Sequence, residues 1–528
     1  MPRSIRTKHL SGHIARPDDF TDHMAGVFAW PGIVEFDDIL DEVYPMRASR
    51  KWPNRQLWAM KVCARLARGT VNAARAADRA GWDAARQAHF DTFGEWLPVE
   101  VPSAQVTDEL YRRVAADADA LQEMQARRLE VAVAQAKLYG WFDPAKPWDY
   151  TDPDESLTVI GDGTIIDEYS RIRFDPAGQV GRWGYQHTRA SAPHRVRYQQ
   201  MRRNPTKVPD HKGKDGINFI SFYTWTPFGT VGFGSVAELG AEIDGAQPFI
   251  DALVAEIGEG FRFLDYDRVV TGWRRHRLMA LYGVSAVNRE NAASSVDHER
   301  ARDYLERQAR QIAATAGLTV EKATLEALMR TTARTLIEQD APLPLGINLY
   351  ATTAGYDAVN GKRYPYGTVT ADAADHACEP ELWADDGALW VVENGIKTAR
   401  CTPRRSTAER LADGSFAQHT DWHVPCPHGG FDHHSVWYPQ RTQRDSRRRD
   451  RRQRALDNIR VPSRRDPGFK AANQRNLSES VNQTAQTTTQ HHGRASSPDG
   501  MVQTLDMLCV HHMIDAETHQ RAVRAGAY

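Results

Sequence analysis

Asp162 stands where a carboxylate is costly unless something compensates its charge. It lies inside the apolar run of residues 157–166, directly between Gly161 and Gly163. Burying an ionised group in a strand is unfavourable without a partner or a metal ion. Glycine on both sides would let another group approach the backbone closely. These features favour a metal-and-phosphate site at Asp162.

Two further acids are candidates for the same site. Asp267 lies in the stretch 261–272, where a strand is expected to end just before a helical pattern. Because functional carboxylates are common at the carboxyl ends of strands in α/β sheets, we prefer Asp267, with Asp265 as the alternative. Glu479 follows Arg475 by four residues, so a helix would place both side chains on one face.

The order of these motifs resembles the DDE transposases of bacterial insertion sequences, which share a ribonuclease H-like fold. The shared order is strand-Asp-Gly-Thr, basic hairpin, helix, strand-Asp, long insertion and Arg-x-x-x-Glu. In that family the first Asp lies on the first strand, the second at the end of the fourth strand, and the Glu on a later helix. Asp162, Asp267 and Glu479 match these places, and the resemblance runs from about residue 155 onward.

The sequence also departs from the family pattern. Many members have a Tyr and a Lys around the Arg and Glu, where this chain has Ala472 and Gln486. The interval between Asp267 and Glu479 is 479 − 267 = 212 positions, which implies an inserted domain. A β-like region from about 345 to 437 would supply much of that insertion.

The resemblance implies a two-metal reaction on DNA. Mg²⁺ prefers oxygen ligands and keeps several waters, so a few carboxylates and the scissile phosphate complete its shell. Two such ions, Mg²⁺ or Mn²⁺, would activate a water or a DNA 3′-hydroxyl and stabilise the leaving oxygen. Arg475 would orient Glu479 or contact a phosphate. The sequence has no G-x-x-x-x-G-K-[ST] loop, so we expect no nucleotide cofactor.

Composition and periodicity predict an α/β protein of several units. The chain has 528 residues, 41% of them hydrophobic and 26% charged, as in ordinary globular proteins. We expect a helical domain at 1–150, the first part of a ribonuclease H-like mixed sheet core at 151–292, a helical and β-rich insertion at 293–460, and the rest of the core at 461–528. Within the first domain, residues 68–81 resemble a DNA-binding helix-turn-helix with its turn at Gly81; a plain helical hairpin is the alternative.

Basic residues cluster in three places that could neutralise DNA phosphates. The first is an expected loop near residues 195–214, the second an arginine run at 441–465, and the third the segment after the predicted acidic helix. The residues singled out are Arg195, Arg197, Arg202, Arg203, Lys207, Arg448, Arg451, Arg452 and Arg494. The alternative is that these side chains are solvated and bind no DNA.

Residues 419–434 are dense in zinc-type ligands. Cys426 and His428 are the first choices for a structural Zn²⁺ in the insertion. The spacing matches no standard pair of zinc ligands, so a solvated histidine-rich loop is the alternative.

The sequence therefore predicts a transposase that cleaves DNA and transfers strands with Mg²⁺ or Mn²⁺. Its expected partners are double-stranded terminal inverted repeats and a second copy of the chain on DNA. Five widely spaced cysteines and the lack of a long apolar segment favour a cytoplasmic protein, located at the nucleoid when bound to DNA. The alternatives are a nuclease of the same fold without strand transfer and a catalytically dead, transposase-derived DNA-binding protein.

Overall fold

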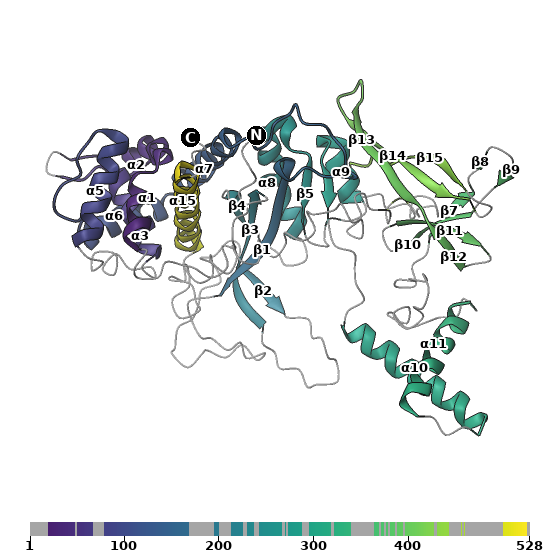
Figure 1. The fold of residues 1–528 in the computed structure, drawn as a ribbon. Coiled ribbons are helices and arrows are strands. Elements are labelled where there is room, and N and C mark those ends of the chain that lie inside the picture. Colours follow the sequence, from purple (N-terminus) through teal and green to yellow (C-terminus); the bar gives the residue numbers. More distant parts are fainter. Residues whose placement is uncertain are drawn as a thin grey trace.

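The computed structural model describes most of the helices and strands that the sequence predicts (Figure 1). The described residues are 20–47, 50–66, 79–167, 195–199, 213–224, 230–236, 242–266, 270, 273–287, 295–317, 321–338, 364–368, 371–373, 376–378, 381–385, 388–393, 396–426, 430–442, 456, 459 and 500–524. They form a mixed α/β protein with several sheets, which confirms the predicted class.

The N-terminal block is helical, as predicted. Its elements are α1 (Phe20–Phe28), η2 (Pro31–Phe36), α2 (Asp37–Val43), α3 (Asn54–Leu66), α5 (Arg79–Phe93), α6 (Ala104–Ala116) and α7 (Ala118–Leu138). Side-chain caps fix two of the helix starts: Ser103 accepts a hydrogen bond from the Val106 N–H, and Asp117 accepts one from the Ala120 N–H. These caps satisfy amide groups that the first turn of a helix leaves without a backbone partner.

Gly81 is not the turn that the helix-turn-helix interpretation requires. It lies inside α5, where a Cβ atom would come within 3.4 Å of the Thr21 hydroxyl on α1. A Cβ at that distance makes an ordinary contact, and Gly81 belongs to a helix that packs on α1. The rest of the proposed motif, residues 68–78, lies outside the described residues.

The central sheet has six strands. They are β1 (Thr158–Asp167), β2 (Arg195–Gln199), β3 (Gly213–Thr224), β4 (Thr230–Val236), β5 (Phe263–Asp265) and β6 (Ser285–Val287). The order is β2-β3-β1-β5-β6, and β4 follows β2 along the same edge of β3. β3 is antiparallel to β1, β2 and β4, whereas β5 and β6 run parallel to β1.

Two helices connect the parallel strands. α8 (Glu242–Ile257), followed by η4 (Gly258–Gly260), leads from β4 to β5, and α9 (Trp273–Tyr282) leads from β5 to β6. The predicted strand at 261–270 is thus much shorter, at Phe263–Asp265. The predicted basic loop at 195–214 contains β2, because its residues pair with the start of β3.

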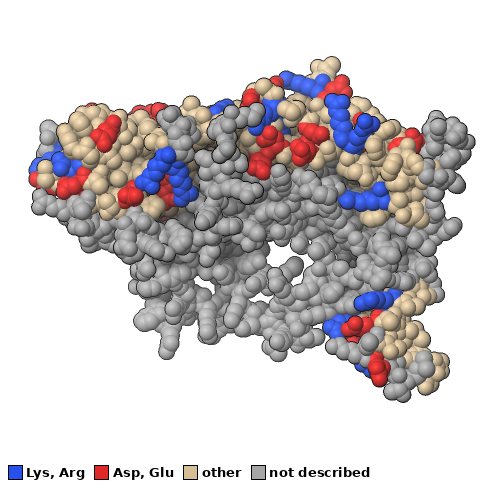
Figure 2. All heavy atoms as spheres, viewed as in Figure 1, with Lys and Arg blue, Asp and Glu red and all other residues tan. Residues whose placement is uncertain are grey.

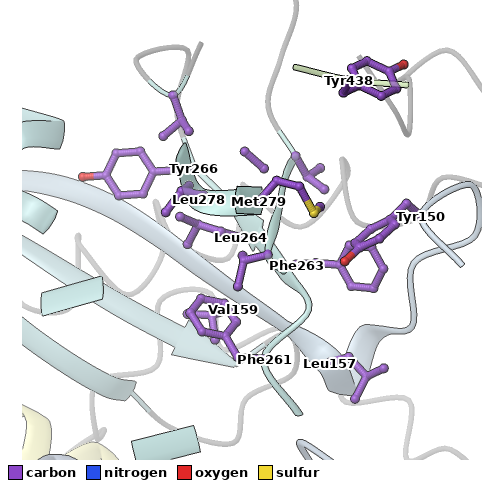
Figure 3. Close-up of a cluster of buried hydrophobic side chains, with 14 of the residues drawn as sticks. Tyr150, Leu157, Val159, Phe261, Phe263, Leu264, Tyr266, Leu278, Met279 and Tyr438 are labelled. Carbon is purple, nitrogen blue, oxygen red and sulfur yellow. The ribbon is translucent and has the colours of Figure 1, made fainter. Parts of the chain in front are cut away.

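Buried side chains from the sheet, α8 and α9 form one hydrophobic cluster. Figure 3 shows part of it, where Leu264 and Val159 from neighbouring strands lie near Leu278 and Met279 of α9. η3 (Glu155–Leu157) leads into β1 and contributes Leu157 to the same cluster. This packing fixes β5 beside β1, which is the strand pair that carries the candidate acids.

The C-terminal helix α15 (Gly500–Arg524) completes the core of the N-terminal block. It contacts α1, α3, α6 and α7 and also β4 (Figure 1). Leu505, Leu508 and Met513 are buried there together with Phe219 and Phe233 of the sheet. A helix from about residue 501 was predicted, but this set of neighbours was not.

Residues from about 345 to 437 were predicted to form short strands and turns, and the described residues of this stretch form strands. Its elements are β7 (Tyr364–Thr368), β8 (Ala371–Ala373), β9 (His376–Cys378), β10 (Glu381–Asp385), β11 (Ala388–Glu393), β12 (Ile396–Arg400), β13 (Thr402–Arg410), β14 (Phe416–Pro425) and β15 (Phe431–Trp437). One sheet has the order β12-β11-β10-β7, another β13-β14-β15, and β8 pairs with β9. Two further helices, α10 (Ser295–Thr315) and α11 (Lys322–Glu338), pack on each other ahead of these strands.

Candidate acidic site on the central sheet

Asp162 lies in the middle of β1, as the sequence predicts. Its side chain is half-buried, and its Oδ1 accepts a hydrogen bond of 3.0 Å from the Gly163 N–H. Gly161 serves packing: a Cβ there would come within 2.4 Å of the Tyr266 ring and 3.0 Å of the Phe222 ring. The glycine before Asp162 therefore makes room for two aromatic rings.

The register of the sheet places Asp162 on the same sheet face that α15 packs against at Ser221. Asp162 pairs directly with Ser221 of β3, so both side chains project to one face. Ser221 is 1% exposed, and its Oγ lies 3.5 Å from Nε2 of His511 on α15. The carboxylate thus lies at the margin of the packed region between sheet and helix.

Tyr223 shows how close the charge of Asp162 is to that buried region. Burial raises the pKa of Tyr223, and the negative charge of Asp162 raises it further, against a hydrogen bond with Ser221 that lowers it. The phenol therefore stays protonated beside the carboxylate.

Asp265 ends β5, the strand next to β1. It pairs with Ile160, two residues before Asp162, so Asp162 and Asp265 project to the same face. Strand spacing and rise place their Cα atoms about 8 Å apart. Asp265 is 3% exposed, whereas Asp162 is half-buried. Of the predicted acids that the structure describes, these two come together.

The other two predicted metal ligands, Asp267 and Glu479, lie outside the described residues, as does Arg475, which was predicted to orient Glu479. The register of β1 and β5 joins residues 265 − 160 = 105 positions apart, and the same interval, 267 − 162, separates Asp162 from Asp267.

Most of the predicted DNA-contacting residues also lie outside the described part of the chain. Arg195 and Arg197 belong to β2, where they pair with Ile217 and Asp215. The residues that are not described are Arg202, Arg203, Lys207, Arg448, Arg451, Arg452 and Arg494. On the face seen in Figure 2, the described Lys and Arg side chains of the helical block are interspersed with Asp and Glu.

The histidine-rich segment forms strands, not the solvated loop considered above. Residues 416–425 belong to β14 and 431–437 to β15, and the Cys426 N–H donates a hydrogen bond of 3.1 Å to the Gly430 carbonyl. Cys426 is buried, and His428 lies outside the described residues. Within the described residues, no three His, Cys, Asp or Glu side chains form a group that could hold a metal ion.

The buried histidines of α15, His511 and His512, were not predicted from the sequence. His511 stacks on Phe233 with ring centroids 4.4 Å apart, and His512 accepts a hydrogen bond of 2.8 Å from the Trp58 Nε1–H. Burial lowers the pKa of both histidines well below the usual value, and the charge of Arg128 lowers it further. The sequence feature that could have indicated them is a pair of adjacent histidines between apolar residues of a predicted helix.

Comparison of the chain with protein-family models, curated proteins and solved structures finds no match. Among the helices that the structure describes, none combines the length and apolar character needed to cross a membrane.

Proposed function

We propose that the chain is a metal-dependent DNA phosphodiester-cleaving enzyme of the DDE transposase type, with a ribonuclease H-like core. The observation that carries the proposal is the placement of Asp162 on β1 beside the parallel strand β5, which ends at Asp265, two residues before Asp267. Asp162 is also partly open to solvent, as a group that meets a substrate must be.

The strand order supports this assignment. β2 extends the edge of β3 that β4 also occupies, so the main succession is β1, β3, β4, β5 and β6. In that succession Asp162 lies on the first strand, and the fourth ends at Asp265, two residues before Asp267. DDE transposases carry their first two acids in these same two positions.

We assign the second ligand to Asp267 and keep Asp265 as the alternative. The interval from Asp162 to Asp267 equals the register interval between β1 and β5. In addition, the nearly complete burial of Asp265 suits a structural acid better than one that meets DNA. Glu479 is proposed as the third ligand and Arg475 as its orienting residue.

The chemistry follows from the ligand types. Carboxylate oxygens suit Mg²⁺ or Mn²⁺, which would supply charge stabilisation at the scissile phosphate. In cleavage, a water oxygen attacks phosphorus, the bond from phosphorus to the 3′-oxygen breaks, and that oxygen takes a proton as it leaves. In strand transfer, the freed 3′-hydroxyl attacks a phosphate of the target DNA in the same manner.

Nicking of supercoiled plasmid DNA in Mn²⁺ tests the proposal. Asp162→Asn is expected to slow nicking by more than about 100-fold, because losing even an outer-shell partner of a metal typically costs 10- to 100-fold. Asp152→Asn is the matched control, since Asp152 is exposed just before β1. Calorimetric titration with Mn²⁺ should show weaker binding to Asp162→Asn irrespective of turnover.

Comparison of Asp267→Asn with Asp265→Asn decides which acid is the second ligand. We expect the larger loss of nicking for Asp267→Asn. Nicking by Asp162→Asn at the wild-type rate would exclude the catalytic assignment of Asp162. Absence of metal-dependent nicking by the wild-type chain would instead favour the non-catalytic DNA-binding alternative. Joining of a labelled 3′-end to plasmid DNA would separate a transposase from a nuclease of the same fold.

A further inference from the structure

One face of the β13-β14-β15 sheet is turned to solvent. On β14 the residues Thr420, Trp422 and Val424 are buried, whereas His419 and His423, between and beside them, are only half-buried. This alternation shows that the strand packs one side and exposes the other. The packed side joins the main hydrophobic cluster through Trp422 and Val424.

The exposed face, here called the aromatic face, carries a strip of rings. Phe431 is 66% exposed and Trp437 is 53% exposed, both on the edge strand β15. His419 stacks on Trp437 with centroids 4.8 Å apart and planes at 22°. His423 lies 5.7 Å from Phe431 and 4.7 Å from His433. Phe431 and Trp437 are six residue steps apart along β15, so the strip is about 20 Å long.

A β-bulge brings two consecutive arginines to this face. The register shifts between Pro403 and Arg405, and Arg404 and Arg405 are both exposed although they are neighbours in the chain. Bulges redirect side chains in this way. Arg404 reaches across the sheet, with its Nη1 3.5 Å from Nε2 of His433 on β15. In Figure 2, Lys and Arg side chains are visible on the part of the surface where Figure 1 shows β13 and β14.

The central acid of the aromatic face already has partners. Asp421 pairs with Arg405 across the strands and accepts a hydrogen bond from the Ser435 hydroxyl. Nε2 of His419 lies 3.9 Å from its carboxylate. The hydrogen bond from Ser435 holds this carboxylate in the sheet, whereas Arg404 and Arg405 are the exposed cations of the aromatic face.

We propose that the aromatic face binds a single strand of nucleic acid. Every base offers a flat π-face, and stacking on exposed aromatic side chains is the usual way in which unpaired bases are held. Arginine matches phosphate because its planar group donates two parallel hydrogen bonds. A duplex hides its base faces, and an uncharged oligosaccharide would leave the two arginines unused. The proposal does not depend on the acidic site, which lies on another sheet.

Fluorescence anisotropy with labelled dT15 and the full chain tests this, in EDTA so that no divalent cation contributes. Trp437→Ala and Phe431→Ala should each weaken binding about 5- to 100-fold, as loss of one stacked base usually does. Trp96→Ala is the matched control, because Trp96 is 54% exposed but lies in the helical block. Circular dichroism would verify that each variant is folded.

The arginines have a separate readout. Arg404→Ala/Arg405→Ala should weaken binding and lower the slope of log Kd against log salt by about 1.4, because two phosphate contacts are lost from a single strand. Wild-type affinity in both aromatic variants would overturn the proposal. So would equal losses for a matched duplex, or tight binding of xylohexaose that depends on Trp437.

Discussion

Arg128 of α7 and Asp515 of α15 form a buried ion pair with two hydrogen bonds. Nε of Arg128 lies 3.0 Å from Oδ2 of Asp515, and Nη2 lies 2.9 Å from Oδ1. Burial nevertheless raises the pKa of Asp515 to about 6, against the lowering effect of Arg128. The pair joins the last helix to the N-terminal block at a point where an unpaired charge would be costly.

We therefore expect Arg128→Met to lower the free energy of unfolding by about 3–5 kcal/mol, because it leaves a buried carboxyl without its partner. Arg112→Met is the control: Arg112 is 69% exposed and pairs with Glu109 on the surface, so its loss should cost less than about 1 kcal/mol. Urea unfolding followed by circular dichroism measures both. Equal costs for the two variants would contradict the assignment of the buried pair.

The adjacent histidines of α15 predict a loss of stability in acid. Burial holds the pKa of His511 and His512 well below 6.5 in the folded chain. The unfolded chain takes up protons at both positions below pH 6.5 and the folded chain does not. The free energy of unfolding is thus highest above pH 6.5 and falls as the pH drops, by about 1.4 kcal/mol per pH unit for each histidine.

Asp515 opposes this trend in a narrower window. Its pKa is raised from 3.8 to about 6, so the folded chain holds a proton that the unfolded chain lacks between those values. As the pH falls below 6, protonation of Asp515 therefore raises the free energy of unfolding by about 1.4 kcal/mol per pH unit, which offsets the loss from one histidine. Urea titrations should show a net fall in the free energy of unfolding between pH 7.5 and 5. His511→Asn should reduce the slope of that fall by about 1.4 kcal/mol per pH unit. An unchanged slope in that variant would argue against a neutral buried His511.

Gly161 is predicted to be intolerant of even one added carbon. Gly161→Ala would drive a Cβ into the rings of Tyr266 and Phe222 and should cost about 1–3 kcal/mol. It should also slow nicking, because the next residue is Asp162. Gly232→Ala in β4 is the control, since its Cβ would have no neighbour closer than 3.8 Å. Thermal unfolding compares the two variants, and the prediction fails if both have the same Tm.

Local pattern predicted the elements around the candidate site well. The apolar run at 157–166 became β1, Thr158–Asp167, because continuous apolar residues with β-branched side chains suit a central strand. The strand expected at 261–270 is shorter within the described residues: Phe263–Asp265 pairs with β1 and β6. An apolar run does not reveal where its neighbours end.

Partners distant in the sequence could not be predicted. A helical period shows that one face of α15 is buried but not that Trp58 and Phe233 lie against it. The strand pattern of β15 likewise did not show that Trp437 faces solvent, since alternation identifies two faces without saying which one is covered. Both answers depend on how whole elements pack.

The packing of α15 also has a consequence for synthesis of the protein. On the ribosome, the apolar surfaces of α1, α3 and α6 emerge long before residues 500–524, which complete their core. Until translation reaches that helix, the nascent N-terminal block has part of its core uncovered, a state that attracts chaperones and favours aggregation. Assembly of this core therefore waits until the central sheet and the strands β7 to β15 have been made.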